Sequence, residues 1–526
     1  MQNDRPDVTS AESPRRAKSP EWGLVCAARR PLAEGAMRGI FPTLALLVAP
    51  VAVAGTDSLP DPAPARRDPA PPNIVFILTD DLGRHDLGAY GSTFHETPNL
   101  DRLARSGVRF SQAYTASGVC SPTRASLLTG RHPARIGITD WLPGRRSAPT
   151  DLLLAPRLPG YLAATDVTFA EIFRTAGYRT ALIGKWHLGG AKENLPEQHG
   201  FDVNIGGSEK GHPPSYFSPH RLPNLPDGPV GEHLDDRLTR EAIAFIRDAQ
   251  TRAQPFLLYL THYSPHTPLQ AKPDLVEKYR EKLRRHPPAG PEFADGPPDG
   301  RVRIAQTNPI YAAMIETLDT SIGTLLAELD ALGLSENTIV VFTSDNGGLS
   351  TAEGWATSNL PLRTGKGWAY EGGVRAPLLV RWPGKIPAGT ETSAVVTTPD
   401  FFPTLLELAG LPLQPAAHLD GQSFASTLSQ PDAPTPERTI FWHYPHYSNQ
   451  RGRPHSAVRH GDWKLIEWLE DGRVELFDLA ADLAEARDLA TAQPERTASL
   501  RQELHAWRTR VGARMPTPNP EHSPSP

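Results

Sequence analysis

The sequence predicts an α/β fold: a large, mainly parallel or mixed β-sheet sandwiched by helices, with a smaller C-terminal antiparallel sheet plus one helix. Two observations predict it. From residue 73 to residue 344, short apolar runs rich in β-branched residues alternate with helical patterns, which is typical of a parallel sheet with helices on both faces. Near the C-terminus, strand-like runs follow one another around a tight-turn pair, as in an antiparallel sheet.

The elements of the large sheet are predicted in chain order. Strands are expected at the apolar runs 73–78, 179–184, 255–261 and 337–344. Helices are expected where apolar residues recur at helical spacing, at 97–107, 168–177, 236–249 and 311–333. The smaller sheet is expected within 456–479, around the turn pair Asp471-Gly472, and its helix at 494–511.

The composition is that of a globular protein with a large core. The chain has 526 residues, of which 39% are hydrophobic and 21% charged, and this length is typical of about two to three domains. The formal net charge of −5 gives no general attraction to nucleic acid or to an anionic membrane. An anionic substrate must therefore be held by a local cluster of basic side chains.

The first 72 residues differ from the rest of the chain. Residues 1–55 are interpreted as an N-terminal extension with a signal peptide, because a basic residue and an apolar stretch follow Met37 and a small-residue cleavage motif lies at 52–54. The apolar stretch is too short and too rich in proline for a stable membrane span. Met37 is an alternative start of translation. Residues 56–72 form a proline-rich linker.

The rest of the chain is divided into a large domain at 73–400, a C-terminal α+β subdomain at 401–512 and a disordered tail at 513–526.

The signal peptide predicts export to the periplasm or the medium. Because the sequence holds no Asn-x-Ser/Thr site, a bacterial exported protein is favoured over a glycosylated lysosomal one. A chain trimmed near Gly55 keeps Cys120 as its one cysteine and has no internal disulfide.

Chemically active side chains follow all four predicted strands of the large sheet. They are Asp80, Asp81, Lys185, His187, His266, Asp345 and Asn346. Ligands of open parallel sheets bind outside the carboxyl ends of the strands. We therefore expect these side chains, far apart in the sequence, to meet at one edge of the sheet.

The oxygen donors in this set suit a hard cation. Asp80, Asp81, Asp345 and Asn346 offer four hard ligands, which are typical of Ca²⁺ or Mg²⁺ rather than of zinc. Taken alone, each pair more often forms a turn, since Asp, Asn and Gly are the usual turn residues. Their joint occurrence with basic residues at strand ends favours the cation site.

Cys120 stands at the beginning of a predicted helix. Ser121 is a good N-cap and Pro122 a good first helical residue, which places Cys120 just before the helix. Helix N-termini attract anions, and Arg124 adds a planar cation. A small buried thiol is the commoner role of a lone cysteine. A thiolate phosphatase is a second interpretation, which the spacing of Cys120 and Arg124 disfavours.

The CSPTR motif at 120–124 resembles the Cys-x-Pro-x-Arg signature of type I sulfatases, a formylglycine-dependent, arylsulfatase-like family of the alkaline phosphatase superfamily. In that family the cysteine is oxidised to formylglycine after translation. The resemblance extends from Asn73 to about Ala490. Its specificity comes from an ordered set of motifs: LTDDLG, CSPTRASLLTGRHPARIGI, GYRTALIGKWHLG, HGFD, HTPLQ, SDNGG, GKGWAYEGGVRAPLLVRWPG and WKLI.

The resemblance implies an alkaline phosphatase-like fold and the hydrolysis of sulfate esters by the domain at 73–400. Residue 120, as a hydrated aldehyde, would attack sulfur with one hydroxyl and later expel sulfate with the other. The cation, Ca²⁺ or alternatively Mg²⁺, would favour the deprotonated hydroxyl. Its ligands would be Asp80, Asp81, Cys120 in its oxidised form, Asp345 and Asn346.

The family's catalytic roles carry over one position at a time. His187 would act as the base, and Lys185 would hold a sulfate oxygen. His266 would contact the sulfate and the ester oxygen, while Lys366 would protonate or stabilise the leaving alcohol. Taken alone, such residues are more often solvated. The implied catalytic set is Cys120, Arg124, Lys185, His187, His266 and Lys366, of which Lys185, His266 and Lys366 also bind substrate.

Two long loops rich in proline and glycine are candidate determinants of substrate choice: Gly206–His233 and Arg284–Arg303. Both also fit inert surface insertions, the second more so. Arg145 and Arg146 are candidates to face a polyanionic sugar, although a solvated charge pair is the commoner arrangement. Aryl sulfates, sulfated glycans and sulfated small alcohols stay open as substrates.

Two alternative functions are a phosphate or phosphonate ester hydrolase of the same superfamily and a non-catalytic sulfated-glycan binding protein in which Cys120 stays a thiol. The favoured interpretation requires a sulfated small molecule or glycan as substrate. It also requires a formylglycine-generating or anaerobic maturation enzyme as partner. No nucleic-acid partner is expected.

Overall fold

The computed structural model describes residues 70–297 and 300–523. The predicted signal peptide, the alternative start at Met37 and most of the predicted linker lie outside these residues. Among the residues that are described, no helix has both the length and the apolar character needed to cross a membrane.

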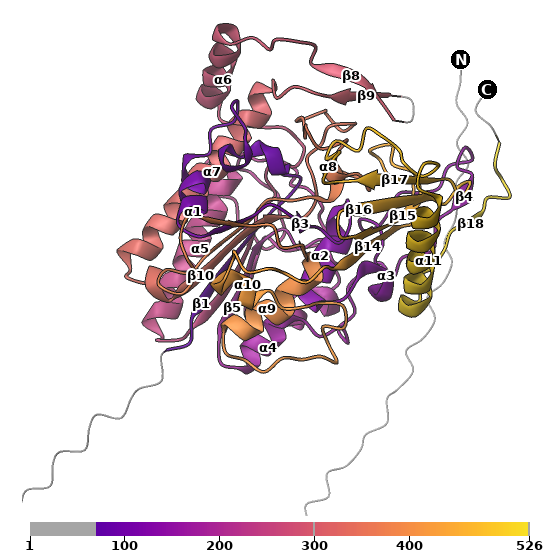
Figure 1. Cartoon of the computed structure of the whole chain (residues 1–526). Coiled ribbons are helices and arrows are strands. Elements are labelled where there is room, and N and C mark those ends of the chain that lie inside the picture. The colour runs from indigo at the N-terminus through magenta and orange to yellow at the C-terminus, as the bar shows by residue number, and fades with distance from the viewer. Residues whose placement is uncertain (1–69, 298–299, 524–526) are drawn as a thin grey trace, which may run out of the picture. The chain divides into compact units, whose positions relative to one another are not determined.

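A mixed sheet lies at the centre of the fold (Figure 1). It has eight strands in the order β12-β2-β11-β10-β1-β7-β5-β6. The four predicted strands are neighbours and run parallel: β10 (Thr338–Ser344), β1 (Asn73–Thr79), β7 (Phe256–Thr261) and β5 (Arg179–Gly184). The outer strands are shorter: β12 (Thr390–Thr392), β2 (Val108–Phe110), β11 (Leu378–Arg381) and β6 (Val203–Ile205). Because β11 is antiparallel to both neighbours, the sheet is mixed.

Alternate residues of β1 enter separate cores on the two faces of the sheet, because successive strand side chains point in opposite directions. Val75 and Ile77 belong to one core, and Phe76 and Leu78 to the other. The first core holds α1 (Pro98–Arg105), α5 (Leu234–Thr251), α6 (Pro273–Arg285) and α7 (Pro309–Ala331). The second holds α2 (Cys120–Thr129), α4 (Phe169–Thr175), α9 (Phe401–Leu408) and α10 (Ala425–Ser429). The predicted layered α/β fold is confirmed.

The smaller sheet is antiparallel, as predicted, in the order β14-β15-β16-β17. Its strands are β14 (Thr439–Tyr444), β15 (His455–His460), β16 (Trp463–Trp468) and β17 (Val474–Asp478). The helix α11 (Pro494–Val511) packs on it, where the rings of Phe441 and Trp507 stack with centroids 4.6 Å apart. The sequence pattern predicts this helix and three of the strands, but not β14.

Shorter elements complete the described residues. The short helices are α3 (Pro133–Ile136) and α8 (Glu371–Val374). The remaining strand pairs are β3 (Ala113–Tyr114) with β13 (Val396–Thr397), β8 (Phe293–Gly296) with β9 (Gly300–Arg303), and β4 (Leu153–Leu154) with β18 (Thr517–Pro518). The 3₁₀ helices are η1 (Arg84–Asp86), η2 (Gly88–Tyr90), η3 (Lys192–Asn194), η4 (Pro196–His199), η5 (Ser335–Asn337) and η6 (Thr398–Asp400).

The C-terminal residues differ from the disordered tail predicted at 513–526. Residues 517–518 form β18, which pairs with β4, and the side chain of Asn519 donates to the carbonyl of Asp151 at 2.8 Å. The partner strand lies more than 300 residues away in the sequence, so the local composition does not indicate the pairing.

The domain division stays a prediction. The packing of Phe401 and Leu405 in a core of the large sheet favours a boundary after α10.

A buried ion cluster connects the smaller sheet to α8. Lys464 Nζ on β16 lies 2.9 Å from a carboxylate oxygen of Glu371 and 2.9 Å from one of Glu485, and all three side chains are fully buried. Burial raises the pKa of Glu485 to about 7, and the charge of Glu371 adds to the rise while Lys464 opposes it.

We expect Glu485→Gln to remove part of the pH dependence of stability. Glu485 binds its proton more tightly in the folded state, so the free energy of unfolding falls as pH rises from its ordinary pKa of 4.5 towards about 7. In the variant this fall should be smaller, as measured by denaturant unfolding across that range. Glu495→Gln, at an exposed position, serves as the control. A pH profile identical to that of the wild type would contradict the assignment.

Candidate active site

The ends of β1 and β10 bring four oxygen-bearing side chains together. Asp80 and Asp81 follow β1, and Asp345 and Asn346 follow β10, the parallel neighbour of β1. The Asp81 N–H donates to Asp345 Oδ1 at 3.3 Å, and Asn346 Nδ2 donates to Asp81 Oδ1 at 2.8 Å. All four residues are fully buried. As predicted, these four side chains meet at one edge of the sheet.

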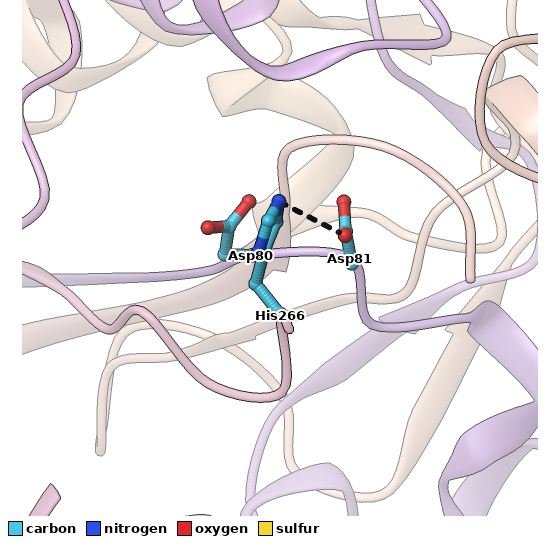
Figure 2. Close-up of side chains that lie close together, drawn as sticks. All are labelled: Asp80, Asp81 and His266. Carbon is cyan, nitrogen blue, oxygen red and sulfur yellow. Dashed lines mark ion pairs between the residues drawn. The ribbon is translucent and has the colours of Figure 1, made fainter. Parts of the chain in front are cut away.

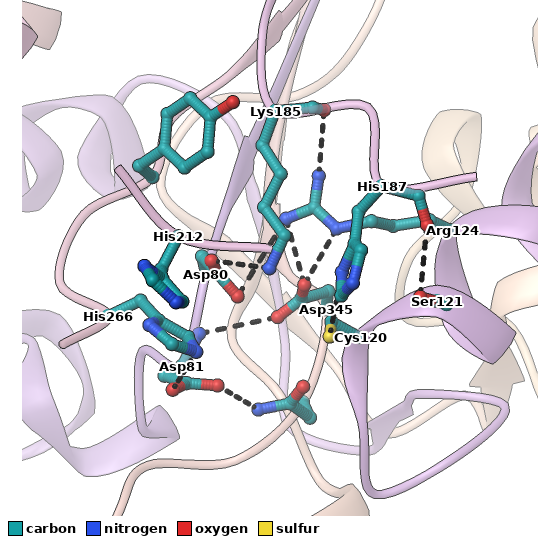
Figure 3. Close-up of polar contacts among 12 residues, drawn as sticks. Asp80, Asp81, Cys120, Ser121, Arg124, Lys185, His187, His212, His266 and Asp345 are labelled. Atoms are coloured by element: carbon teal, nitrogen blue, oxygen red, sulfur yellow. Dashed lines mark hydrogen bonds and ion pairs between the residues drawn. The ribbon is translucent and has the colours of Figure 1, made fainter. Parts of the chain in front are cut away.

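Three cationic side chains surround these carboxylates, and Figure 3 shows two of them, Lys185 and Arg124. Lys185, which follows β5, lies with Nζ 2.7 Å from Asp80 Oδ2. Lys366 Nζ lies 2.8 Å from Asp81 Oδ1, and Arg124 Nη2 lies 2.8 Å from Asp345 Oδ2. The three cations balance the three carboxylates. These buried pairs therefore leave the local charge near zero before any ligand is considered.

His266 stands beside the acidic pair (Figure 2). Its Nε2 lies 3.5 Å from Asp81 Oδ2, and one ligand atom each of Asp80, Asp81 and His266 lies within 4.8 Å of the others. The imidazole Nδ1–H donates to the carbonyl of Thr267 at 2.7 Å, which turns Nε2 towards the carboxylates. These residues have the donor types and closeness that a bound metal ion requires.

Cys120 is the first residue of α2, which corrects the prediction that it precedes the helix; Val119 takes the N-cap position. Ser121 does not cap the helix because its hydroxyl joins two loops, donating to the His187 carbonyl and accepting from the Leu142 N–H, each at 3.0 Å. Arg124 lies one turn further along the same helix face as Cys120. The helix thus places both residues of the motif at the strand ends.

His187 presents a free lone pair to Cys120. Its Nε2 lies 2.6 Å from the Leu142 carbonyl, which can only accept, so Nε2 carries the hydrogen. Burial, assisted by Lys185, lowers the pKa of His187 well below its ordinary value, and the ring is neutral. Nδ1 is then the acceptor, 3.3 Å from Cys120 Sγ. This tautomer suits a base that acts on residue 120.

The pKa values of Asp80 and Asp81 are shifted in opposite directions. Burial alone raises the pKa of Asp81, but Lys366 and His266 lower it to about 2. Burial raises the pKa of Asp80 well above its ordinary value, and the charges of Asp345 and Asp81 add to this. Burial also raises the pKa of the Cys120 thiol, and a protonated thiol is a weak nucleophile.

The local backbone is strained at two of these residues. Asp81 has φ 65° and His187 has φ 59°, a left-handed conformation that non-glycine residues rarely adopt. Such residues cluster at active sites, where the surrounding structure holds them in place. The strain agrees with a site built for precise placement of side chains.

Two oxygens in this cluster fit an additional ligand. Within the part of the chain that the structure describes, Asp80 Oδ1 and Asn346 Oδ1 are buried and have no hydrogen-bond partner. A buried acceptor without a partner is costly. Since both are hard oxygen donors beside two further carboxylates, the residues present fit Ca²⁺ or Mg²⁺.

The structure adds positioning residues that the sequence does not reveal. The Tyr216 hydroxyl lies 2.7 Å from the Tyr263 carbonyl and 2.8 Å from the His266 carbonyl, which holds the His266 loop. His212 lies beside His266 (Figure 3), and the two rings stack with centroids 6.1 Å apart. Tyr216, His212 and the Leu142 carbonyl act through contacts between distant loops, so no local motif marks them.

We expect Gly211→Ala to lower kcat. A Cβ at Gly211 would lie 2.7 Å from His187 Cε1, and the ring has no room to move because Leu142 holds it at 2.6 Å. A displaced base should reduce turnover by about 10- to 100-fold with little change in melting temperature. Gly290→Ala, where no atom lies within 4 Å of the added Cβ, is the matched control. Unchanged kcat would contradict the close contact.

Known proteins are similar to this chain over most of its length. The family model "Sulfatase" matches residues 72–411, and the model "N-sulphoglucosamine sulphohydrolase, C-terminal" matches residues 364–510. A sulfatase of Formosa agariphila is 32% identical over 511 residues, covering 83% of this chain and 88% of that protein. Human arylsulfatase A is 36% identical over 423 residues, covering 75% and 74%. The crystal structure of Ps i-CgsB in complex with k-i-k-neocarrahexaose has a TM-score of 0.68 and 30% identity, covering 83% and 92%.

Proposed function

Because this chain belongs to the sulfatase family and is therefore a sulfuric ester hydrolase, we propose that it cleaves sulfate esters with an oxidised Cys120, a divalent cation and the cationic side chains around them. One observation carries the proposal. Residues between positions 80 and 366 meet at the ends of four parallel strands in one buried, hydrogen-bonded cluster.

The proposed cation is Ca²⁺, with Mg²⁺ as the alternative, and its ligands are Asp80, Asp81, Asp345, Asn346 and residue 120. The unpaired oxygens of Asp80 and Asn346 support this assignment. When bound, such a cation lowers the pKa of an attached hydroxyl and draws charge from a sulfate oxygen. The three carboxylates and three cationic side chains balance, so a divalent ion would make the site positive and attract an anionic ester.

Residue 120 is proposed to be formylglycine, formed from Cys120 by a maturation enzyme of the host. Its hydrate supplies two hydroxyls on one carbon, one to attack sulfur and one to expel sulfate. The CSPTR motif and the position of Cys120 against His187 support this role. The His187 Nδ1 lone pair is oriented to take a proton from a hydroxyl at residue 120.

The remaining side chains bind and orient the ester. Arg124 holds Asp345 and the Lys185 carbonyl, and so keeps the helix at the strand ends. Lys185 and His266 are proposed to contact sulfate oxygens, and Lys366 to stabilise or protonate the leaving oxygen. Their burial, with exposures of 8% or less, keeps bulk water away and strengthens each interaction.

The experiment combines mass analysis with paired substrates. Matured protein should release sulfate from 4-nitrophenyl sulfate faster than it releases phosphate from 4-nitrophenyl phosphate. The peptide that contains residue 120 should lose sulfur and two hydrogens and gain one oxygen. An active sample with an unmodified thiol would overturn the formylglycine assignment, and a preference for the phosphate ester would favour the phosphate or phosphonate hydrolase.

Export to the periplasm or the medium is part of this proposal. It is supported by the apolar stretch after Met37 and the small residues at 52–54, which lie outside the described residues. N-terminal sequencing of the protein from the native host should give a start near Gly55. A start at Met1 or Met37 would contradict cleavage.

A further inference from the structure

A cleft of about 570 Å³ is lined by residues of two loops that are far apart in the sequence. Arg145 comes from one loop and Tyr447, Gly452 and Arg453 from the other, and Glu470 also lines the cleft. We call it the arginine cleft. Of these residues, the sequence marks only Arg145, as a candidate to face a polyanionic sugar, and the proposed catalytic roles use none of them.

One wall of the arginine cleft belongs to the loop that is hydrogen-bonded to His187, the proposed base. The Leu142 carbonyl accepts the hydrogen bond from His187 Nε2, and Arg145 follows three residues later. Consecutive Cα atoms are about 3.8 Å apart, so the Cα atoms of Leu142 and Arg145 are within about 11 Å. Buried Asp140 holds this loop by accepting from the Arg145 N–H at 3.2 Å and from the Tyr444 hydroxyl at 2.8 Å.

The opposite wall is attached to the loop of Lys366. A Cβ at Gly452 would lie only 2.0 Å from the Gly367 carbonyl oxygen, so the two backbones are in contact. The Trp368 indole N–H also donates to the Gln450 carbonyl at 3.0 Å. Since Gly367 directly follows Lys366, the arginine cleft begins beside the proposed leaving-group side of the active site.

The arginine cleft presents guanidinium groups to a ligand. Arg145 pairs with Asp151 through two hydrogen bonds of 2.6 and 3.0 Å, and Arg453 lies 3.2 Å from Glu470. The arginine side chains are 26% and 42% exposed, whereas their carboxylate partners are 6% and 9% exposed. The accessible side of each pair is therefore cationic. Guanidinium groups match carboxylate and sulfate groups with paired hydrogen bonds.

We propose that the arginine cleft binds an anionic sugar next to the sugar whose sulfate ester is cleaved, so that the preferred substrate is a sulfated oligosaccharide with a second carboxylate or sulfate. The proposal rests on the proposed function. Tyr447 completes the cleft with an aromatic ring whose hydroxyl donates to Glu470 at 2.6 Å. The Arg145 guanidinium lies over this ring, 5.6 Å from the ring centroid, so the ring helps to hold Arg145 in the cleft.

The test compares kcat/KM for three substrates: 4-nitrophenyl sulfate, a sulfated disaccharide with a neutral neighbouring sugar, and the same disaccharide with a carboxylate on that neighbour. The wild type should prefer the third. Arg453→Gln should lower kcat/KM about 10-fold for the third substrate, as expected for the loss of one hydrogen bond to a charged group. The other two substrates should be unaffected.

Two further variants make the result specific. Arg453→Lys keeps the charge without the paired donors and should retain part of the preference. Arg247→Gln changes an arginine on α5 that is 61% exposed and lies 2.8 Å from Glu328, outside the arginine cleft, and should change nothing. An equal loss on all three substrates, or no wild-type preference, would overturn the inference. Failure of matured wild type to release sulfate from every substrate would instead overturn the proposed function.

Discussion

Cys120→Ser and Cys120→Ala should abolish sulfate release, with kcat reduced by at least about 1,000-fold, while the fold stays intact. Serine supplies one hydroxyl where a hydrated aldehyde supplies two, and alanine supplies none. Neither change should unfold the protein, because the side chain is small and the site is held by many other hydrogen bonds. The alanine cavity should cost about 1 kcal/mol. Sulfate release and thermal unfolding measure the two effects separately.

The control for this prediction lies on the same helix. Ser126 on α2 is fully buried, and its hydroxyl has no hydrogen-bond partner among the described residues. Ser126→Ala should therefore leave both activity and melting temperature close to those of the wild type. Near-normal turnover in Cys120→Ser would show that residue 120 is not the nucleophile.

Asp345→Asn should lose the response to Ca²⁺ together with activity. The variant keeps the shape of the side chain but removes the negative charge of a proposed ligand, which Arg124 also contacts at 2.8 and 2.9 Å. In the wild type, Ca²⁺ at about 100 times its dissociation constant should stabilise the fold by about 2.7 kcal/mol. A chelator should reverse this, as followed by thermal unfolding.

An ion pair outside the strand-end cluster separates metal loss from simple destabilisation. Asp400 is a buried carboxylate that lies 2.7 Å from Arg438 Nη2, and it is bonded to the backbone N–H groups of Thr397 and Gln422 rather than to any proposed metal ligand. Asp400→Asn should destabilise the protein, because it breaks a buried pair, yet keep the Ca²⁺ response. Full activity of a metal-free wild type, or a normal Ca²⁺ response in Asp345→Asn, would refute the ligand assignment.

The main sheet could be predicted because each of its long strands is a short apolar run that can be recognised in the sequence. The run at 73–78 is apolar on both faces, as buried parallel strands are, and β1 begins at Asn73 as expected. The candidate site could be predicted for the same reason. Parallel strands end at one edge, so residues that follow them meet there, as Asp80 and Lys185 do at 2.7 Å.

Other features depend on partners that are distant in the sequence. Serine is a residue type that favours the N-cap position, yet the Ser121 hydroxyl bonds to Leu142 and His187 instead. The tail at 513–526 has the composition of a disordered segment, yet Asn519 is held by Asp151. In both cases tertiary hydrogen bonds override a weak local preference.

The layered α/β fold, the family signature around Cys120 and the identity of the strand-end residues follow from local periodicity and short motifs, so they can be inferred without coordinates. The fold in three dimensions is needed to tell which nitrogen of His187 faces Cys120, which cation lies beside each carboxylate and how Arg145 and Arg453 come to line one cleft. Each of these depends on hydrogen bonds and charge pairs between loops that are far apart along the chain. No local pattern of residues encodes such contacts.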